Sequence, residues 1–231
     1  MGSAEQPAYE LQVFTPQALQ EHACLPALWR MINRAFANHH RALIPPTLAH
    51  ARYGAPQDVV RELGRHGICC VLLEITDGAS HPIATAAIKP YTEVLLVEGD
   101  PNAPALIPNG GDGPSETDKS QASWMSIQDW ELSSVAVDQD AKYAKQGLAS
   151  RCCAEAERYL ADQFRGAAKR RENNGQVPGK LTIWIRGIKE NVGAYWARRG
   201  YQDVSVRVVG KGGWGATRSF ELVSLNKELV L

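Results

Sequence analysis

Short apolar runs separated by polar turns predict a sheet with helices packed on it. Apolar and β-branched residues dominate seven segments, each of which we expect to form a strand: 11–14, 68–75, 83–91, 130–137, 181–185, 201–209 and 218–223. The turn Thr76-Asp77-Gly78 between two of these segments predicts an antiparallel hairpin. The glycine-rich stretch 210–215 separates the last two strands and is interpreted as a second hairpin loop.

Apolar residues at helical spacing predict the helices. Thr15 is a suitable cap and Pro16 a suitable first residue for a helix, and Pro26 predicts a break or a new helix start. We expect a short helix over 58–66 that ends at Gly67. The clearest amphipathic pattern covers 147–164, and a further short helix over 190–199 ends at Gly200, which suits a left-handed terminal position.

The order of these elements predicts a single α+β domain over residues 1–231, with a mixed, mostly antiparallel central sheet flanked by helices. Residues 98–123 are rich in Pro, Gly, Asn, Asp and Ser. Because strand pattern resumes directly after them, we expect a flexible loop inside the domain and not a domain boundary.

Composition narrows the function classes. Lys+Arg and Asp+Glu number 25 each, so there is no basic excess that would favour nucleic acid or an anionic membrane as a partner. The five cysteines show no C-x-x-C spacing, so neither a disulfide framework nor a metal site is expected. The first residues are polar and no apolar run is long enough to span a bilayer. We therefore expect a cytoplasmic protein.

The junction between the strand 130–137 and the helix 147–164 carries the most informative chemistry. At a helix start, the first backbone N–H groups lack partners within the helix and lie at the positive end of its dipole. Gly147 allows close approach of a ligand, Ala149 adds little bulk, and Lys142 and Lys145 add positive charge at the rim. This pattern predicts a phosphate or pyrophosphate site, although a plain strand-to-helix turn remains the alternative from this segment alone.

Two motifs resemble those of the GCN5-related N-acetyltransferase superfamily. Val135-Ala136-Val137 followed by Gln146-Gly147-Leu148-Ala149 is similar to its acetyl-CoA motif, Gln/Arg-x-x-Gly-x-Gly/Ala, with Ala144 in place of the first Gln or Arg. The segment 195–201, YWARRGY, is similar to its second signature, with Trp196 where Tyr is usual.

The resemblance implies acetyl-CoA as the cosubstrate and a sheet whose two central strands splay apart. The backbone of Val135, Ala136 and Val137 would pair with the pantetheine arm of the cofactor. The N–H groups of five consecutive residues would hold its pyrophosphate: Lys145, Gln146, Gly147, Leu148 and Ala149.

Two residues are candidates for proton transfer. Glu131 lies six residues before Val137, so regular alternation places it on the same face as Val135 and Val137, and the resemblance implies a general base at this spacing. A surface carboxylate near a strand start is the alternative. Tyr195 is the candidate general acid because the indole of Trp196 cannot serve as one, and water is the other possible proton donor.

These observations predict an N-acetyltransferase that moves an acetyl group from acetyl-CoA to a primary amine by direct attack in a ternary complex, with a small-molecule amine as acceptor. Two alternatives stay open: a protein or peptide acetyltransferase, and a CoA-binding regulatory module with weak catalysis. We expect no metal, no nucleic acid and no membrane among its partners, and a monomer or homodimer.

Overall fold

The computed structural model describes residues 8–44, 51–76, 78–92, 124–170, 179–213 and 216–231. The expected loop 98–123 lies outside the described residues. Within them, none of the helices is both long and apolar enough to cross a membrane.

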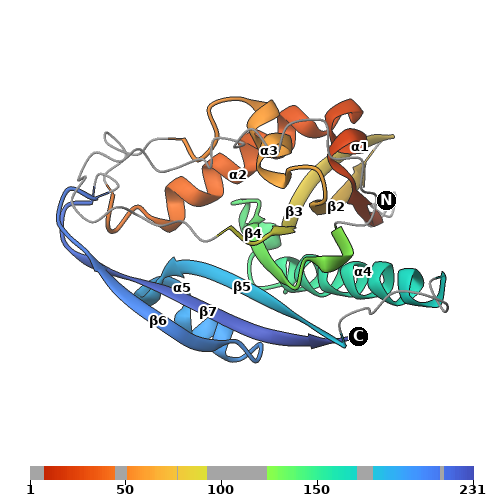
Figure 1. Ribbon diagram of the computed structural model, residues 1–231. Helices are drawn as coiled ribbons and strands as arrows, with labels where there is room; N and C mark the ends of the chain where they lie inside the picture. The colour runs from red at the N-terminus through yellow and green to blue at the C-terminus, as the bar shows by residue number, and fades with distance from the viewer. Residues whose placement is uncertain (1–7, 45–50, 77, 93–123, 171–178, 214–215) are drawn as a thin grey trace.

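Seven strands form one sheet in the order β1-β2-β3-β4-β5-β7-β6, and all neighbours are antiparallel except β4 and β5 (Figure 1). The strands are β1 (Ala8–Phe14), β2 (Ile68–Thr76), β3 (Ala79–Pro90), β4 (Asp129–Val137), β5 (Lys180–Ile188), β6 (Gln202–Val209) and β7 (Phe220–Val230). The predicted mixed, mostly antiparallel α+β fold is confirmed, with both hairpins in place.

Helices cover both faces of the sheet. The helices α1 (Pro16–Glu21), α2 (Leu25–His39) and α3 (Pro56–Leu63) lie on one face, and α4 (Leu148–Arg170) lies on the other, as Figure 1 shows. The last helix, α5 (Lys189–Ala197), packs against β5 and β7. Each face has its own apolar core: one contains Leu28, Val59 and Val71, and the other contains Leu72, Leu160 and Phe164.

Local sequence signals set most helix ends. The Thr15 hydroxyl accepts a hydrogen bond from the Ala18 N–H at 3.3 Å and caps α1, and α2 begins just before Pro26. Gly200 adopts the expected left-handed conformation, with φ +83°. The expected end of α3 at residue 66 is wrong, because Gly64, with φ +61°, ends the helix three residues earlier.

The centre of the sheet opens between its two parallel strands. β4 and β5 pair through only three residue pairs, which involve Asp129, Trp130 and Glu131 of β4. A bulge follows at Ser134, whose φ of +49° is unusual for a residue with a side chain. Beyond Glu131, β4 keeps its ladder with β3, and β5 diverges from it. The predicted splay of the central strands is confirmed.

Candidate functional site

A pocket of about 290 Å³ lies where the loop after β4 enters α4. It is lined by residues 137–140, residues 143–150 and Tyr195. The first hydrogen bond of α4 joins the Arg151 N–H to the Gly147 carbonyl at 3.1 Å, so the N–H groups of the preceding residues have no partner within the helix. Positive φ angles at Lys145 (+59°) and Gly147 (+72°) turn the chain at this point.

Most of the predicted cofactor residues meet in this pocket. Val137 and the five residues 145–149 line it. Leu148 is buried and anchors the helix start in the core, and Lys145 is exposed at the rim. A helix N-terminus with exposed N–H groups and a neighbouring lysine is suited to an anion such as a pyrophosphate.

Lys142 is not brought into the pocket lining. Its ammonium contacts the Glu74 carboxylate of β2 at 3.0 Å, and the Tyr143 hydroxyl donates to the same carboxylate at 2.7 Å. The neighbouring Tyr143 and Glu74 raise the pKa of Lys142. Lys142 therefore forms an ion pair with Glu74 beside the pocket, and Lys145 is the lysine that lines the pocket.

The bulge at Ser134 changes which side chains of β4 share a face. Val135 and Val137 pack against the core on the α4 side, and Ala136 belongs to the core on the α1–α3 side. The extra residue reverses the alternation after Ser134. The expectation that Glu131 shares a face with Val135 and Val137 is therefore wrong.

Glu131 faces the α1–α3 side and is only 7% exposed. Its carboxylate is held by Arg186 of β5, whose Nε and Nη2 donate to it at 3.1 and 2.9 Å. The ammonium of Lys89, from β3, lies 3.6 Å away. Glu131 is therefore a buried, ion-paired carboxylate at the point where β4 and β5 separate, and not a surface residue.

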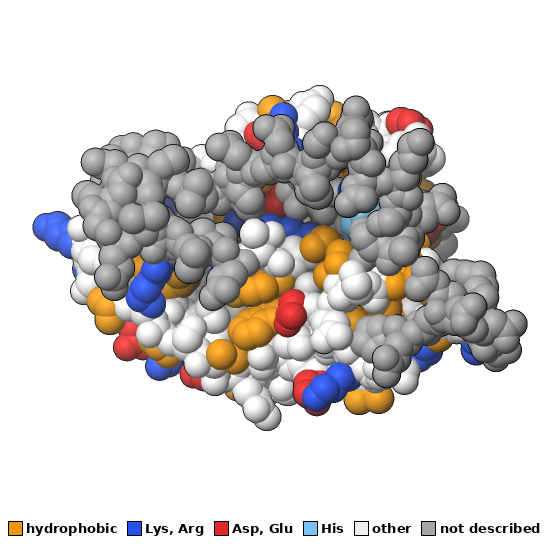
Figure 2. Space-filling model, in the orientation of Figure 1, with side chains coloured by type: hydrophobic (Ala, Val, Ile, Leu, Met, Phe, Trp, Pro, Cys, Tyr) orange, Lys and Arg blue, Asp and Glu red, His pale blue; other side chains and the backbone are white. Residues whose placement is uncertain are grey.

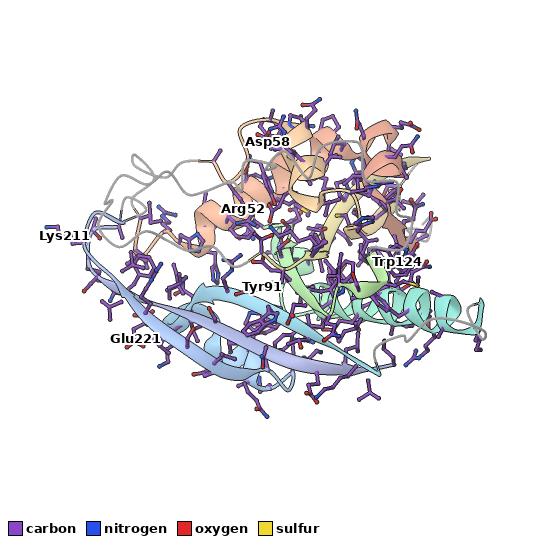
Figure 3. All side chains as sticks on the ribbon, in the orientation of Figure 1. Arg52, Asp58, Tyr91, Trp124, Lys211 and Glu221 are labelled. Atoms are coloured by element: carbon purple, nitrogen blue, oxygen red, sulfur yellow. The ribbon has the colours of Figure 1, made fainter. Side chains whose placement is uncertain are left out.

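These contacts continue into a chain of buried and partly buried charges, which we call the ionic cluster: Arg52, Glu62, Lys89, Glu131 and Arg186. Lys89 contacts the Glu62 carboxylate at 3.0 Å, and Arg52 donates to both oxygens of Glu62 at 3.0 and 3.2 Å. Figure 2 shows charged side chains recessed at the centre of the molecular face that points toward the viewer. Figure 3, in the same orientation, labels Arg52 in this central region.

A buried tyrosine links the cluster to the bulge. The Tyr53 hydroxyl donates to Glu62 and lies 2.5 Å from the Ser134 hydroxyl. Burial, opposed by Arg52 and assisted by Glu62, raises the pKa of Tyr53. For Glu62, burial alone would raise the pKa, but Arg52, Lys89 and the Tyr53 hydrogen bond outweigh it and lower the pKa to about 2. Glu62 therefore remains ionised and holds the cluster together.

Tyr195 and Trp196 have separate environments. Tyr195 is half-buried at the edge of the pocket, its hydroxyl 3.4 Å from the Ser150 hydroxyl, with Arg199 over its ring. Trp196 is buried in the core and makes edge contacts with Tyr195 and Tyr201. Tyr195 is thus the member of this pair that reaches the pocket.

Sequence reasoning missed four members of the ionic cluster: Arg52, Glu62, Lys89 and Arg186. One signal was available, because Lys89 directly follows a run of buried apolar positions in β3 and Arg186 directly follows the apolar half of β5. A charge at such a position usually has a partner. Which charges meet depends on strand register, which the sequence alone does not provide.

No family model and no curated protein sequence matches the chain. Among solved structures, an aminoglycoside 6'-N-acetyltransferase complexed with coenzyme A is similar, with a TM-score of 0.50 and 11% identity over 96% of this chain and 98% of that one. The ribosomal-protein-S18-alanine N-acetyltransferase from Escherichia coli has a TM-score of 0.48 and 14% identity over 97% and 96% of the two chains.

At these identities the likeness concerns the fold alone. The seven-stranded sheet, its single parallel pair and the two helical layers agree with that fold. The chain therefore shares the fold of this aminoglycoside 6'-N-acetyltransferase.

Proposed function

We propose that the protein transfers the acetyl group of acetyl-CoA to a primary amine of a small molecule, by direct attack in a ternary complex. The observation that carries this proposal is the position of the pocket at the α4 N-terminus, next to the opening between β4 and β5. The pocket is suited to the pyrophosphate of the cofactor, and the opening between β4 and β5 is suited to its extended pantetheine arm.

The proposed cofactor path uses backbone groups. The N–H groups of residues 145–149 bind the pyrophosphate, with Lys145 beside them. The edge of β4 that faces away from β3 offers the backbone of Val135, Ala136 and Val137 to the pantetheine arm, because the ladder to β5 ends at Glu131. The thioester then lies near the bulge at Ser134.

The reaction forms a bond between the acceptor nitrogen and the acetyl carbonyl carbon and breaks the bond from that carbon to sulfur. The attacking amine must lose a proton, and the departing thiolate gains one. We assign the first transfer to Glu131 and the second to Tyr195. Both oxygens of Glu131 accept hydrogen bonds from Arg186, so a proton that reaches Glu131 neutralises the partner of that guanidinium and weakens the pair.

A small acceptor is favoured over a protein by the depth of the acceptor side. Glu131 is 7% exposed, and Lys89 beside it is equally buried. A small amine can enter whole to reach such a carboxylate, whereas a folded protein has to insert an extended side chain or a chain end.

Replacing Glu131 by Gln tests the proton acceptor. The amide keeps the size and part of the hydrogen bonding of the side chain but cannot take up the proton, so we expect kcat to fall by about 100-fold or more while acetyl-CoA binding is unchanged. The matched control is Glu157→Gln, because Glu157 is also an ion-paired carboxylate of low exposure but pairs with Lys227 and Tyr201.

The outcomes separate the alternatives. An unchanged rate in the Glu131→Gln variant removes Glu131 from the mechanism. Acetyl-CoA binding without acetyl transfer to any amine in a broad panel favours the regulatory module. Transfer to peptides alone favours a protein acetyltransferase.

A further inference from the structure

The ionic cluster carries an unbalanced positive charge. Its three cations are joined to only two carboxylates. His40 lies close enough to Arg52 to feel its charge; burial, with His39 and Arg52, lowers the pKa of His40 to about 4, so this ring is neutral at pH 7. The nearby Asp129 is exposed and accepts a hydrogen bond from the Trp184 indole at 2.7 Å, so water screens its charge.

Two of the three cations, Arg52 and Arg186, lie at the more accessible side of the cluster, and Lys89 is as buried as the carboxylates. The side chains of Arg52 and Arg186 are 30% and 23% exposed, whereas those of Glu62 and Glu131 are 6% and 10% exposed. A molecule that approaches from the acceptor side therefore meets guanidinium groups before it meets carboxylates. The stacked rings of Tyr91 and Trp184, 4.9 Å apart, flank this region, and Arg186 lies over the Tyr91 ring.

Hydrogen-bonding capacity is also left over. Among the described residues, the Arg52 Nε and the Ser133 hydroxyl are buried and have no hydrogen-bond partner. Arg186 uses its Nε and Nη2 for Glu131. Each buried polar group without a partner costs on the order of 1–3 kcal/mol, so each of the two would be stabilised by a polar group placed against it.

The excess positive charge and the unpaired hydrogen-bonding groups lie next to the proposed reaction centre. Glu131 is the last β4 residue paired with β5, and Ser133 and the bulge at Ser134 lie two and three residues further along. Tyr53, next to Arg52 in the chain, contacts Ser134 at the bulge. A ligand held by the two arginines therefore lies within a short reach of the opening where we place the thioester.

We propose that the acceptor amine carries a carboxylate, and that Arg52 and Arg186 bind this group and orient the amine toward the thioester. This inference rests on the proposed acetyltransferase function and names its substrate class. Each guanidinium has N–H donors beyond those that it gives to Glu62 or Glu131, and such donors form strong, charge-assisted hydrogen bonds with a carboxylate. The single excess charge of the cluster equals the single charge of a carboxylate, whereas a phosphate ester carries about −1.5 to −2 at neutral pH.

The direct test compares amino acids with their own carboxamides as acceptors, with release of the CoA thiol as the readout. A carboxamide removes the negative charge and leaves the amine and the side chain in place. We expect kcat/KM to be about 10- to 100-fold higher for the acid, the effect of one or two hydrogen bonds between charged groups. The loss of the neighbouring negative charge makes the amine of the carboxamide less basic, so greater availability of the free amine cannot explain a preference for the acid.

Arg52→Gln tests the assignment to a residue. We expect KM for the acid to rise by about 10- to 100-fold and KM for the carboxamide to change by less than about twofold. The control is Arg158→Gln, which removes the same charge from an exposed ion pair on α4 and should change neither value. Thermal unfolding of each variant reports whether it folds, and the comparison of acid and carboxamide in the wild type needs no variant.

Two results overturn the inference. One is equal use of acids and carboxamides by an enzyme that binds acetyl-CoA and acetylates amines, and the proposed function then stands. If acetyl-CoA binds and no acceptor turns over, calorimetric binding of acids and carboxamides to the CoA complex decides, and equal affinity overturns the inference. Failure to bind acetyl-CoA at all overturns the proposed function instead.

Discussion

At the scale of single residues, Glu62 determines how the ionic cluster responds to acid. Its pKa is 4.5 in an unperturbed chain and about 2 in the folded protein. A lowered folded-state pKa stabilises the protein above pH 4.5, and this contribution disappears as the pH falls through 2. The shift corresponds to roughly 3 kcal/mol of the free energy of unfolding.

Glu62→Gln should therefore lower the free energy of unfolding at pH 6 and have progressively less effect toward pH 2, measured by urea unfolding across this range. Glu228→Gln is the control, because Glu228 forms an exposed pair with Lys180. If the free energies of unfolding of wild type and Glu62→Gln differ by the same amount at every pH, the assignment is contradicted.

Gly147 combines a left-handed backbone conformation, which glycine adopts without strain, with a place in the pocket. A Cβ at Gly147 meets no atom within 4 Å, but the φ of +72° is unfavourable for alanine by roughly 1 kcal/mol. Gly78 offers a matched control, with φ +76°, the same free space, and no part in the pocket lining. We expect Gly147→Ala and Gly78→Ala to lose similar stability, and only Gly147→Ala to weaken acetyl-CoA binding, by about tenfold in calorimetry. An acetyl-CoA affinity of Gly147→Ala equal to that of the wild type would place the pyrophosphate elsewhere.

Individual residues also show where sequence reasoning stops. The glycine and the apolar residue after it at the start of α4 were identifiable, because helix-start chemistry is local. The left-handed Ser134 was not, since serine has no special preference for this conformation. One such residue reversed the alternation of β4 and separated Glu131 from Val135 and Val137.

At the scale of elements, α5 presents two neighbouring aromatic residues to different environments. Tyr195 reaches the pocket and Trp196 fills the core. Tyr195→Phe should lower kcat by about 100-fold and leave the dissociation constant of acetyl-CoA within about twofold. Trp196→Ala should instead cost about 3–5 kcal/mol of stability. A Tyr195→Phe enzyme with full activity would assign thiolate protonation to water.

The sequence predicted the positions of the strands more completely than it predicted which charged side chains the folded sheet brings together. Hydrophobic alternation and turn residues located all seven strands, because both are properties of the local sequence. The ionic cluster joins charges from α3, from the three central strands β3, β4 and β5, and from the segment before α3. Only strand register brings Lys89, Glu131 and Arg186 together, and register follows from the folded sheet.

At the scale of the whole molecule, the site depends on the opening of one sheet. The pocket that we propose for the pyrophosphate lies on the α4 side of the sheet, and the ionic cluster lies on the α1–α3 side, where Figure 3 labels Arg52. The ladder between β4 and β5 ends at Glu131, and we propose that a cofactor bound on one side of the sheet there meets an acceptor that enters from the other side. Among the described residues no group of His, Cys, Asp or Glu side chains is arranged to hold a metal ion.

Thermal unfolding with and without acetyl-CoA tests the central claim most directly. A ligand at about 100 times its dissociation constant stabilises the folded protein by about 2.7 kcal/mol, which corresponds to an increase of roughly 5–10 °C in Tm for a chain of this length. We predict an increase of this size with acetyl-CoA. An unchanged Tm at millimolar acetyl-CoA would contradict the cofactor site at the start of α4 and the acetyltransferase function proposed from it.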